Sequence, residues 1–127
     1  MMYEAFLSKL IDSGIQGVSG DSAIKVHPKR LAGAVAGFKA CAGLKPEQLA
    51  QLLVESNRKT HNAHIDLVDK RIDNEDYWEA RCFAIQVEWV CNCVSVVLIR
   101  TGKPAILPPT ARGAIAAARV LRDLSLN

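Results

Sequence analysis

Apolar residues are densest between Arg81 and Arg100, a stretch without Gly or Pro. About twenty uninterrupted residues far exceed the usual strand of roughly 5–6, so the pattern predicts a helix over residues 76–99. At about 100° per residue, its polar positions fall within a sector of roughly 60°. We call these positions the polar stripe: Tyr77, Arg81, Glu88, Asn92 and Ser95. Nearly all of the remaining cylinder is apolar, which is typical of a buried helix surrounded by other elements.

A second long helix is predicted over residues 46–72, which contain no Gly and no Pro after Pro46. Its first apolar face comprises Leu49, Leu52, Leu53, Ser56, Thr60, Ala63 and Leu67. A second face, roughly 120–160° away, comprises Val54, His61, Ile65, Val68 and Ile72. A helix with two apolar faces packs on two sides. One side is expected to meet the core, and the other a second helix layer or another copy of the chain.

The N-terminal third predicts shorter elements. A helix over residues 2–12 directs Phe6, Leu7, Leu10 and Ile11 to the core, and three glycines between residues 14 and 20 predict a loop after it. Residues 22–26 fit a brief extended segment. A helix from Pro28 to about Ala42 is rich in Ala and Gly. The spacing of Gly33 and Gly37 predicts close approach of another helix beside a bulky neighbour such as Trp78 or Trp89.

A polar turn over residues 73–76 joins the two long helices, so they should form an antiparallel hairpin. Prolines at 104, 108 and 109 precede a last helix over residues 110–127. We expect its inward positions to be Ala111, Ala114, Ile115, Ala118 and Leu121. The chain is therefore expected to be one all-α domain over residues 1–127, a bundle of about five helices around the hairpin of residues 46–72 and 76–99.

Composition narrows the class of protein. The 127 residues are 50% hydrophobic and 23% charged, which is an ordinary globular balance, and the net charge of +3 is too small to imply a nucleic-acid or membrane partner by itself. The N-terminus lacks the pattern of a signal peptide. Four cysteines lie in apolar helical sequence, which favours reduced thiols and a cytoplasmic location. A membrane span is disfavoured because Glu88, at its middle, would cost roughly 2.5–3.5 kcal/mol.

Residues 44–64 resemble the first half of a helix-turn-helix of repressor type. The residues that carry the resemblance are Leu44, Glu47, Gln48, Leu49, Ala50, Leu53 and Ser56. In that family a Gly makes the turn and an apolar residue packs beneath it, whereas Val54 and Glu55 occupy those positions here. The resemblance implies a DNA-associated regulatory protein. The substitutions at the turn instead predict an uninterrupted helix.

Metal and thiol chemistry have little support in the sequence. His61 and His64 lie three residues apart, but no second pair of ligands has zinc-site spacing. Cys91 and Cys93 point roughly 200° from each other on a helix. No thiol is placed on a turn or at a helix N-terminus, where its pKa would fall. We therefore expect no metal site, no cofactor and no catalysis.

Glu88 and Asn92 form the most informative polar group. A hairpin centred on Asn74 would bring His61 level with Val87 and Arg58 level with Val90. In that register Glu88 is within reach of either His61 or Arg58, and a buried carboxylate would need such a partner. The set Glu88, Asn92, His61 and Arg58 is either a ligand or partner site, a structural ion pair, or a face of the helix exposed to water.

Three functions follow from these patterns. The first is a non-catalytic protein-interaction or assembly module that acts as a homodimer through the second face of helix 46–72. The second is a DNA-associated protein that contacts phosphates through Arg112, Arg119 and Arg122. The third is a ligand-binding protein with a site at Glu88 and Asn92.

Overall fold

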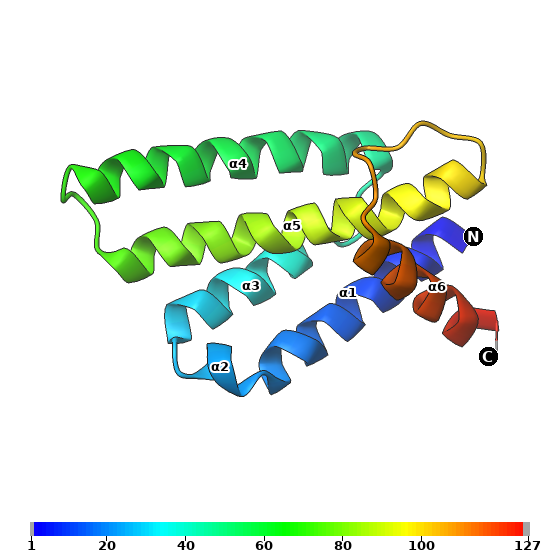
Figure 1. The fold of residues 1–127 in the computed structure, drawn as a ribbon, viewed down its shortest axis with the longest axis horizontal. Coiled ribbons are helices and arrows are strands. Elements are labelled where there is room, and N and C mark those ends of the chain that lie inside the picture. The colour runs from blue at the N-terminus through cyan, green and yellow to red at the C-terminus, as the bar shows by residue number, and fades with distance from the viewer. Residues whose placement is uncertain (1, 126–127) are drawn as a thin grey trace.

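A computed structural model describes residues 2–125 of the chain. These residues form six helices without a strand, which confirms the all-α bundle. The helices are α1 (Met2–Gly20), α2 (Ser22–Lys25), α3 (Pro28–Ala40), α4 (Pro46–Val68), α5 (Asn74–Arg100) and α6 (Ala111–Ser125). In Figure 1, α4 and α5 run antiparallel along the length of the molecule, and α3 packs against α5 on its other side.

The α4–α5 hairpin was predicted, but its turn begins earlier than expected. α4 ends at Val68 rather than at residue 72, and the chain then reverses through Lys70, which has a φ of 59°. The Asp73 carboxylate accepts the backbone N–H of Asp76 at 2.8 Å and so caps α5. Since the reversal lies nearer to Lys70 than to Asn74, the pairing of residues across the hairpin also differs from the prediction.

The first two elements differ from the prediction as well. α1 continues to Gly20 instead of ending at Gly14, because Gly14 provides room for the ring of Phe38 rather than a turn. A Cβ atom at Gly14 would overlap that ring. The segment predicted to be extended is the short helix α2, whose first turn is capped by the Asp21 carboxylate, which accepts the N–H of Ala23 at 2.9 Å.

Close approach of α3 to α5 confirms the interpretation of the glycine spacing. A Cβ atom at Gly33 would collide with the carbonyl oxygen of Glu79, and one at Gly37 with the carbonyl oxygen of Phe83. The neighbour is therefore the α5 backbone, not a tryptophan ring as expected. Trp78 lies beside this crossing, with the guanidinium of Arg30 at 4.8 Å from its ring centroid.

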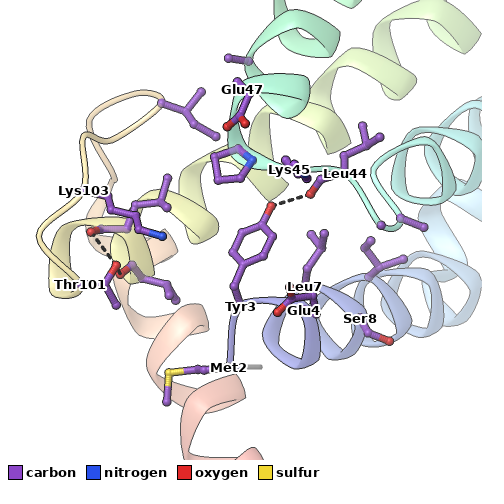
Figure 2. Close-up of a pocket in the computed structure, with 18 of the residues that line it drawn as sticks. Met2, Tyr3, Glu4, Leu7, Ser8, Leu44, Lys45, Glu47, Thr101 and Lys103 are labelled. Carbon is purple, nitrogen blue, oxygen red and sulfur yellow. Dashed lines mark hydrogen bonds between the residues drawn. The ribbon is translucent and has the colours of Figure 1, made fainter.

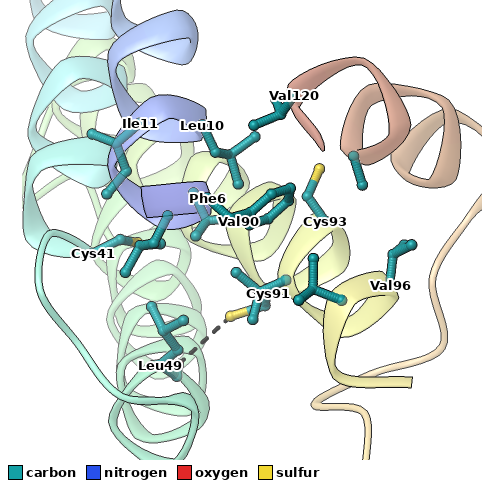
Figure 3. Packing of buried hydrophobic residues seen from close by; sticks show 14 of the residues in the cluster. Phe6, Leu10, Ile11, Cys41, Leu49, Val90, Cys91, Cys93, Val96 and Val120 are labelled. Atoms are coloured by element: carbon teal, nitrogen blue, oxygen red, sulfur yellow. Dashed lines mark hydrogen bonds between the residues drawn. The ribbon is translucent and has the colours of Figure 1, made fainter. Parts of the chain in front are cut away.

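The core is built around α5. Figure 3 shows α1 side chains packed among α5 residues such as Val90 and Cys91, with Cys41 at one side and Val120 at the other. The four α1 residues predicted to face inward are all buried: Phe6, Leu7, Leu10 and Ile11. By length and composition α5 could also cross a membrane, but 67% of its most apolar stretch of 18 residues is buried inside the bundle. Its hydropathy is therefore accounted for by the helices around it.

The inward face of α6 was predicted incorrectly except at Leu121, which is half-buried against the core. Its buried residues are Gly113, Ala117 and Val120, whereas Ile115 is 55% exposed. The rotation is set by Gly113, which meets the side-chain oxygen of Asn92 so closely that a Cβ atom would not fit. The predicted residues 126–127 of this helix lie outside the described residues.

Candidate functional site

The C-terminal half of the polar stripe binds the α5–α6 connection. The buried Ser95 hydroxyl accepts the backbone N–H groups of Ile106 and Leu107 at 3.0 and 3.3 Å. The same hydroxyl donates to the carbonyl oxygen of Cys91 at 2.7 Å. One side chain thus supplies the polar partners of two successive connection residues.

Asn92 holds the start of α6 in the same way. Its side-chain oxygen accepts the N–H of Thr110 at 3.1 Å, and its amide nitrogen donates to the Thr110 hydroxyl at 3.3 Å. That hydroxyl in turn accepts the N–H of Gly113 at 3.1 Å, so it caps the first turn of α6. Asn92 and Ser95 together form a polar latch that fixes the connection on α5.

The other proposed members of the Glu88 site lie elsewhere. Thr60 donates toward the carbonyl oxygen of Ala80, and the Cys91 thiol toward that of Leu49, which fixes the register of the hairpin. In this register His61 lies about two turns of α5 away from the predicted level of Val87, near Ala80. His61, Arg58 and Glu88 are all exposed. The predicted pairing of Glu88 with His61 or Arg58 across the hairpin is therefore wrong.

Two features favoured DNA binding: the helix-turn-helix resemblance in α4 and the arginines of α6. α4 runs without interruption through Val54 and Glu55, so the turn of a helix-turn-helix is not formed there. Arg112, Arg119 and Arg122 are exposed on α6, and Arg122 lies 3.9 Å from the carboxylate of Asp123. Phosphate contact by these arginines stays a prediction.

The second apolar face of α4 is open to solvent. We call it the outer stripe: Val54, His61, Ile65 and Val68. The exposed fractions of Val54, Ile65 and Val68 are 70%, 44% and 66%. Within residues 2–125, α4 packs against α5 and against no other helix, and Figure 1 shows it along one edge of the bundle. The predicted inner face does meet the core, with Leu49 and Ser56 buried.

A shallow hollow of about 400 Å³ lies on this same side of α4. It is lined by Ala50, Gln51, Val54, Glu55 and Arg58. The hollow was not predicted from the sequence, although Val54 was assigned to the second apolar face. Two of the residues that line it are apolar, Ala50 and Val54, and the other three are polar or charged.

A larger cleft of about 1190 Å³ opens between the start of α1, the α3–α4 loop and the end of α5. Figure 2 shows Tyr3 at its centre, with Thr101 and Lys103 on one side and Leu7 and Ser8 on the other. The Tyr3 hydroxyl donates to the carbonyl oxygen of Leu44 at 2.7 Å. Burial is the main cause that raises the pKa of Tyr3 to about 12, so it remains a neutral donor.

The cleft could not be found from local sequence because it joins three segments that are far apart in the chain. The only signal was the apolar sequence around Ala105 and Ile106 in a proline-rich connection. Its rim carries both acidic and basic side chains, among them Glu4, Glu47 and Lys103. The cleft therefore has no strong preference for one sign of charge.

The four cysteines are free and buried. Burial raises the pKa of the Cys41, Cys91 and Cys93 thiols to about 12, and also raises the pKa of Cys82. These thiols are protonated at neutral pH and are poor nucleophiles. Within residues 2–125, no group of three or more His, Cys, Asp or Glu side chains is arranged to hold a metal ion.

A scan of the chain against protein-family models matches no family, and searches of curated proteins and of solved structures find no match.

Proposed function

We propose that this protein is a non-catalytic interaction module that assembles as a homodimer through the outer stripe of α4. The observation that carries the proposal is the position of α4, a helix of 23 residues that, among the described helices, packs on α5 alone and exposes a second apolar face. Single exposed apolar residues are ordinary on a protein surface. Here three of them follow one line on one helix, which is typical of a surface that binds another helix.

The spacing of the outer stripe supports a helical partner. Val54, His61 and Val68 are separated by seven residues each, which is the repeat that keeps a seam of side chains facing a second helix. The four buried thiols support a reducing compartment such as the cytoplasm.

Replacing Val54 by aspartate is the direct test of this surface. Because assembly would bury an unpaired carboxylate in each copy, Val54→Asp is expected to raise the dissociation constant at least about 100-fold. Size-exclusion chromatography with light scattering at 1–200 µM would show the wild type shifting from 13.8 kDa toward about twice that mass, and the variant staying at 13.8 kDa.

Ile115→Asp provides the matched control. It introduces the same charge at an isoleucine that is 55% exposed on α6, and it should leave the dissociation constant unchanged. A wild type that stays monomeric at 200 µM would overturn the homodimer. Equal weakening by both variants would overturn the assignment to α4.

A second candidate function, binding of an apolar small molecule, is favoured by the cleft around Tyr3. Its volume of about 1190 Å³ exceeds the usual range of roughly 300–1,000 Å³ for ligand pockets, and its floor contains the apolar side chains of Leu7, Val97 and Leu98. The polar groups nearest the floor are few and already paired, as Tyr3 is with Leu44. Shape and apolar contact would therefore dominate recognition.

Anilinonaphthalene sulfonate, a fluorescent dye whose aromatic rings bind apolar surfaces, can test this second function. We expect its fluorescence to rise with the folded wild type and to fall at least threefold with Ala105→Trp, whose indole would fill the mouth of the cleft. Ala118→Trp, at an exposed alanine of α6 outside the cleft, should bind the dye as the wild type does. Equal fluorescence with both variants would count against the cleft as the binding site.

A further inference from the structure

The hollow on α4 has the layout of a socket for one side chain. Four of the residues that line it are Gln51, Val54, Glu55 and Arg58, which follow the spacing i, i+3, i+4, i+7. On a helix surface these four positions surround a single depression. Such a depression is the hole that receives one knob in helix packing of the coiled-coil type.

The knob that fits this hole is present on the same helix. Val68 is 66% exposed and lies seven residues after His61, while Val54 lies seven residues before it. A two-fold axis through His61 would therefore bring Val68 of a second copy level with Val54. A contact related by two-fold symmetry uses the same patch on both subunits, so one axis would fill both hollows.

We propose that the second copy packs its α4 antiparallel to the first, with the two-fold axis at His61 and each Val68 in the hollow of the other copy. This inference rests on the proposed homodimer and specifies its geometry. Ile65 then lies level with Asn57 of the second copy, beside the aliphatic stem of its Arg58. The outer stripe is thus covered along its whole length.

Charge favours the antiparallel over the parallel arrangement. In a parallel pair centred on the same stripe, Arg58 would face Arg58 and Glu55 would face Glu55, which places like charges opposite one another. In the antiparallel pair Arg58 lies level with His64 and Glu55 level with Leu67. The two helix dipoles also run in opposite directions.

The extent of the contact sets the strength of the dimer. Residues 51–68 span roughly 27 Å of helix, which is short for an interface expected to bury about 800 Å² per partner. We therefore expect a reversible dimer with a dissociation constant in the micromolar range, and the experiments need concentrations above it.

Single cysteines on the outer stripe test the geometry. A disulfide requires Cα atoms within about 7 Å, and in the antiparallel pair only a residue on the axis meets its own copy at that distance. Under mild oxidation by glutathione disulfide, His61→Cys should give a covalent dimer on a non-reducing gel, whereas Val54→Cys alone should give at least tenfold less. Mixing Val54→Cys with Val68→Cys should restore the covalent dimer. The four native thiols are buried and should not compete.

Each other outcome overturns a defined part of the proposal. A covalent dimer of Val54→Cys alone would show a parallel pair, so the antiparallel inference would fail while the homodimer stood. No crosslinking in any variant, with a wild type that is dimeric by light scattering, would place the interface on another face. A monomeric wild type would overturn the proposed function itself. Unchanged thermal melting of each variant confirms that the fold is retained.

Discussion

Gly37→Ala is expected to lower the free energy of unfolding by about 2 kcal/mol, and Gly33→Ala with Gly37→Ala by about 4 kcal/mol. Alanine is the better helix former by roughly 1 kcal/mol at each site. That gain is outweighed because each added methyl group meets the α5 backbone, and overpacking against an interior that cannot yield costs roughly 1–3 kcal/mol or more. Urea denaturation followed by circular dichroism measures the change.

Gly17→Ala is the matched control for this prediction. Gly17 also lies inside a helix, but a Cβ atom there would have no neighbour within 4 Å. The substitution should therefore raise the free energy of unfolding by roughly 1 kcal/mol. If Gly37→Ala stabilised the protein as Gly17→Ala does, the close approach of α3 to α5 would be refuted.

Ser95→Ala is expected to lower the free energy of unfolding by about 2 kcal/mol, since it leaves the N–H groups of Ile106 and Leu107 without their acceptor. The effect should be local as well as global. Hydrogen exchange followed by NMR should show the amides of Ile106 and Leu107 exchanging at least tenfold faster, with smaller changes for amides in the α4–α5 hairpin.

Ser13→Ala gives the comparison for the latch. Ser13 is exposed on α1, so losing its hydroxyl should change the free energy of unfolding by less than about 0.5 kcal/mol. Exchange of Ile106 and Leu107 at the wild-type rate in Ser95→Ala would show that the Ser95 hydroxyl does not hold the connection.

Patterns with a strong local cause predicted their elements correctly. The hairpin followed from two long stretches without Gly or Pro, and the burial of Phe6, Leu7, Leu10 and Ile11 followed from their helical spacing. Gly33 and Gly37 could be assigned to helix packing because glycine in a helix interior needs a compensating contact. These inferences needed only the positions of residues along one element.

The incorrect predictions concern residue types that serve two different structural roles. Gly14 suggested a turn, but it serves close packing, and nothing local distinguishes the two. The inward face of α6 was ambiguous because alanines occur on nearly every side of that helix. The rotation of α6 is decided by the close contact of Gly113 with Asn92. These two residues are distant in the chain, so no local pattern reveals the contact.

The candidate site was predicted only in part, because its contacts also join distant parts of the chain. The polar stripe was identified along α5, and its C-terminal half does contact another segment through Asn92 and Ser95. The partners of Glu88 were misassigned because the register of a hairpin depends on where the turn begins. A shift of a few residues changes every pair of residues across the hairpin. The cleft around Tyr3 joins three distant segments, which no periodicity encodes.

The latch also has a consequence for the order of folding. Asn92 and Ser95 lie on one side of α5 only after that helix has formed, so their side chains bind residues 106–110 only once α5 is helical. Closing a loop of about ten residues takes only about 10–100 ns, so formation of α5 limits this step rather than the search by the connection. Because α5 does not depend on the latch for its own hydrogen bonds, we expect any local opening of residues 106–125 to leave α5 helical.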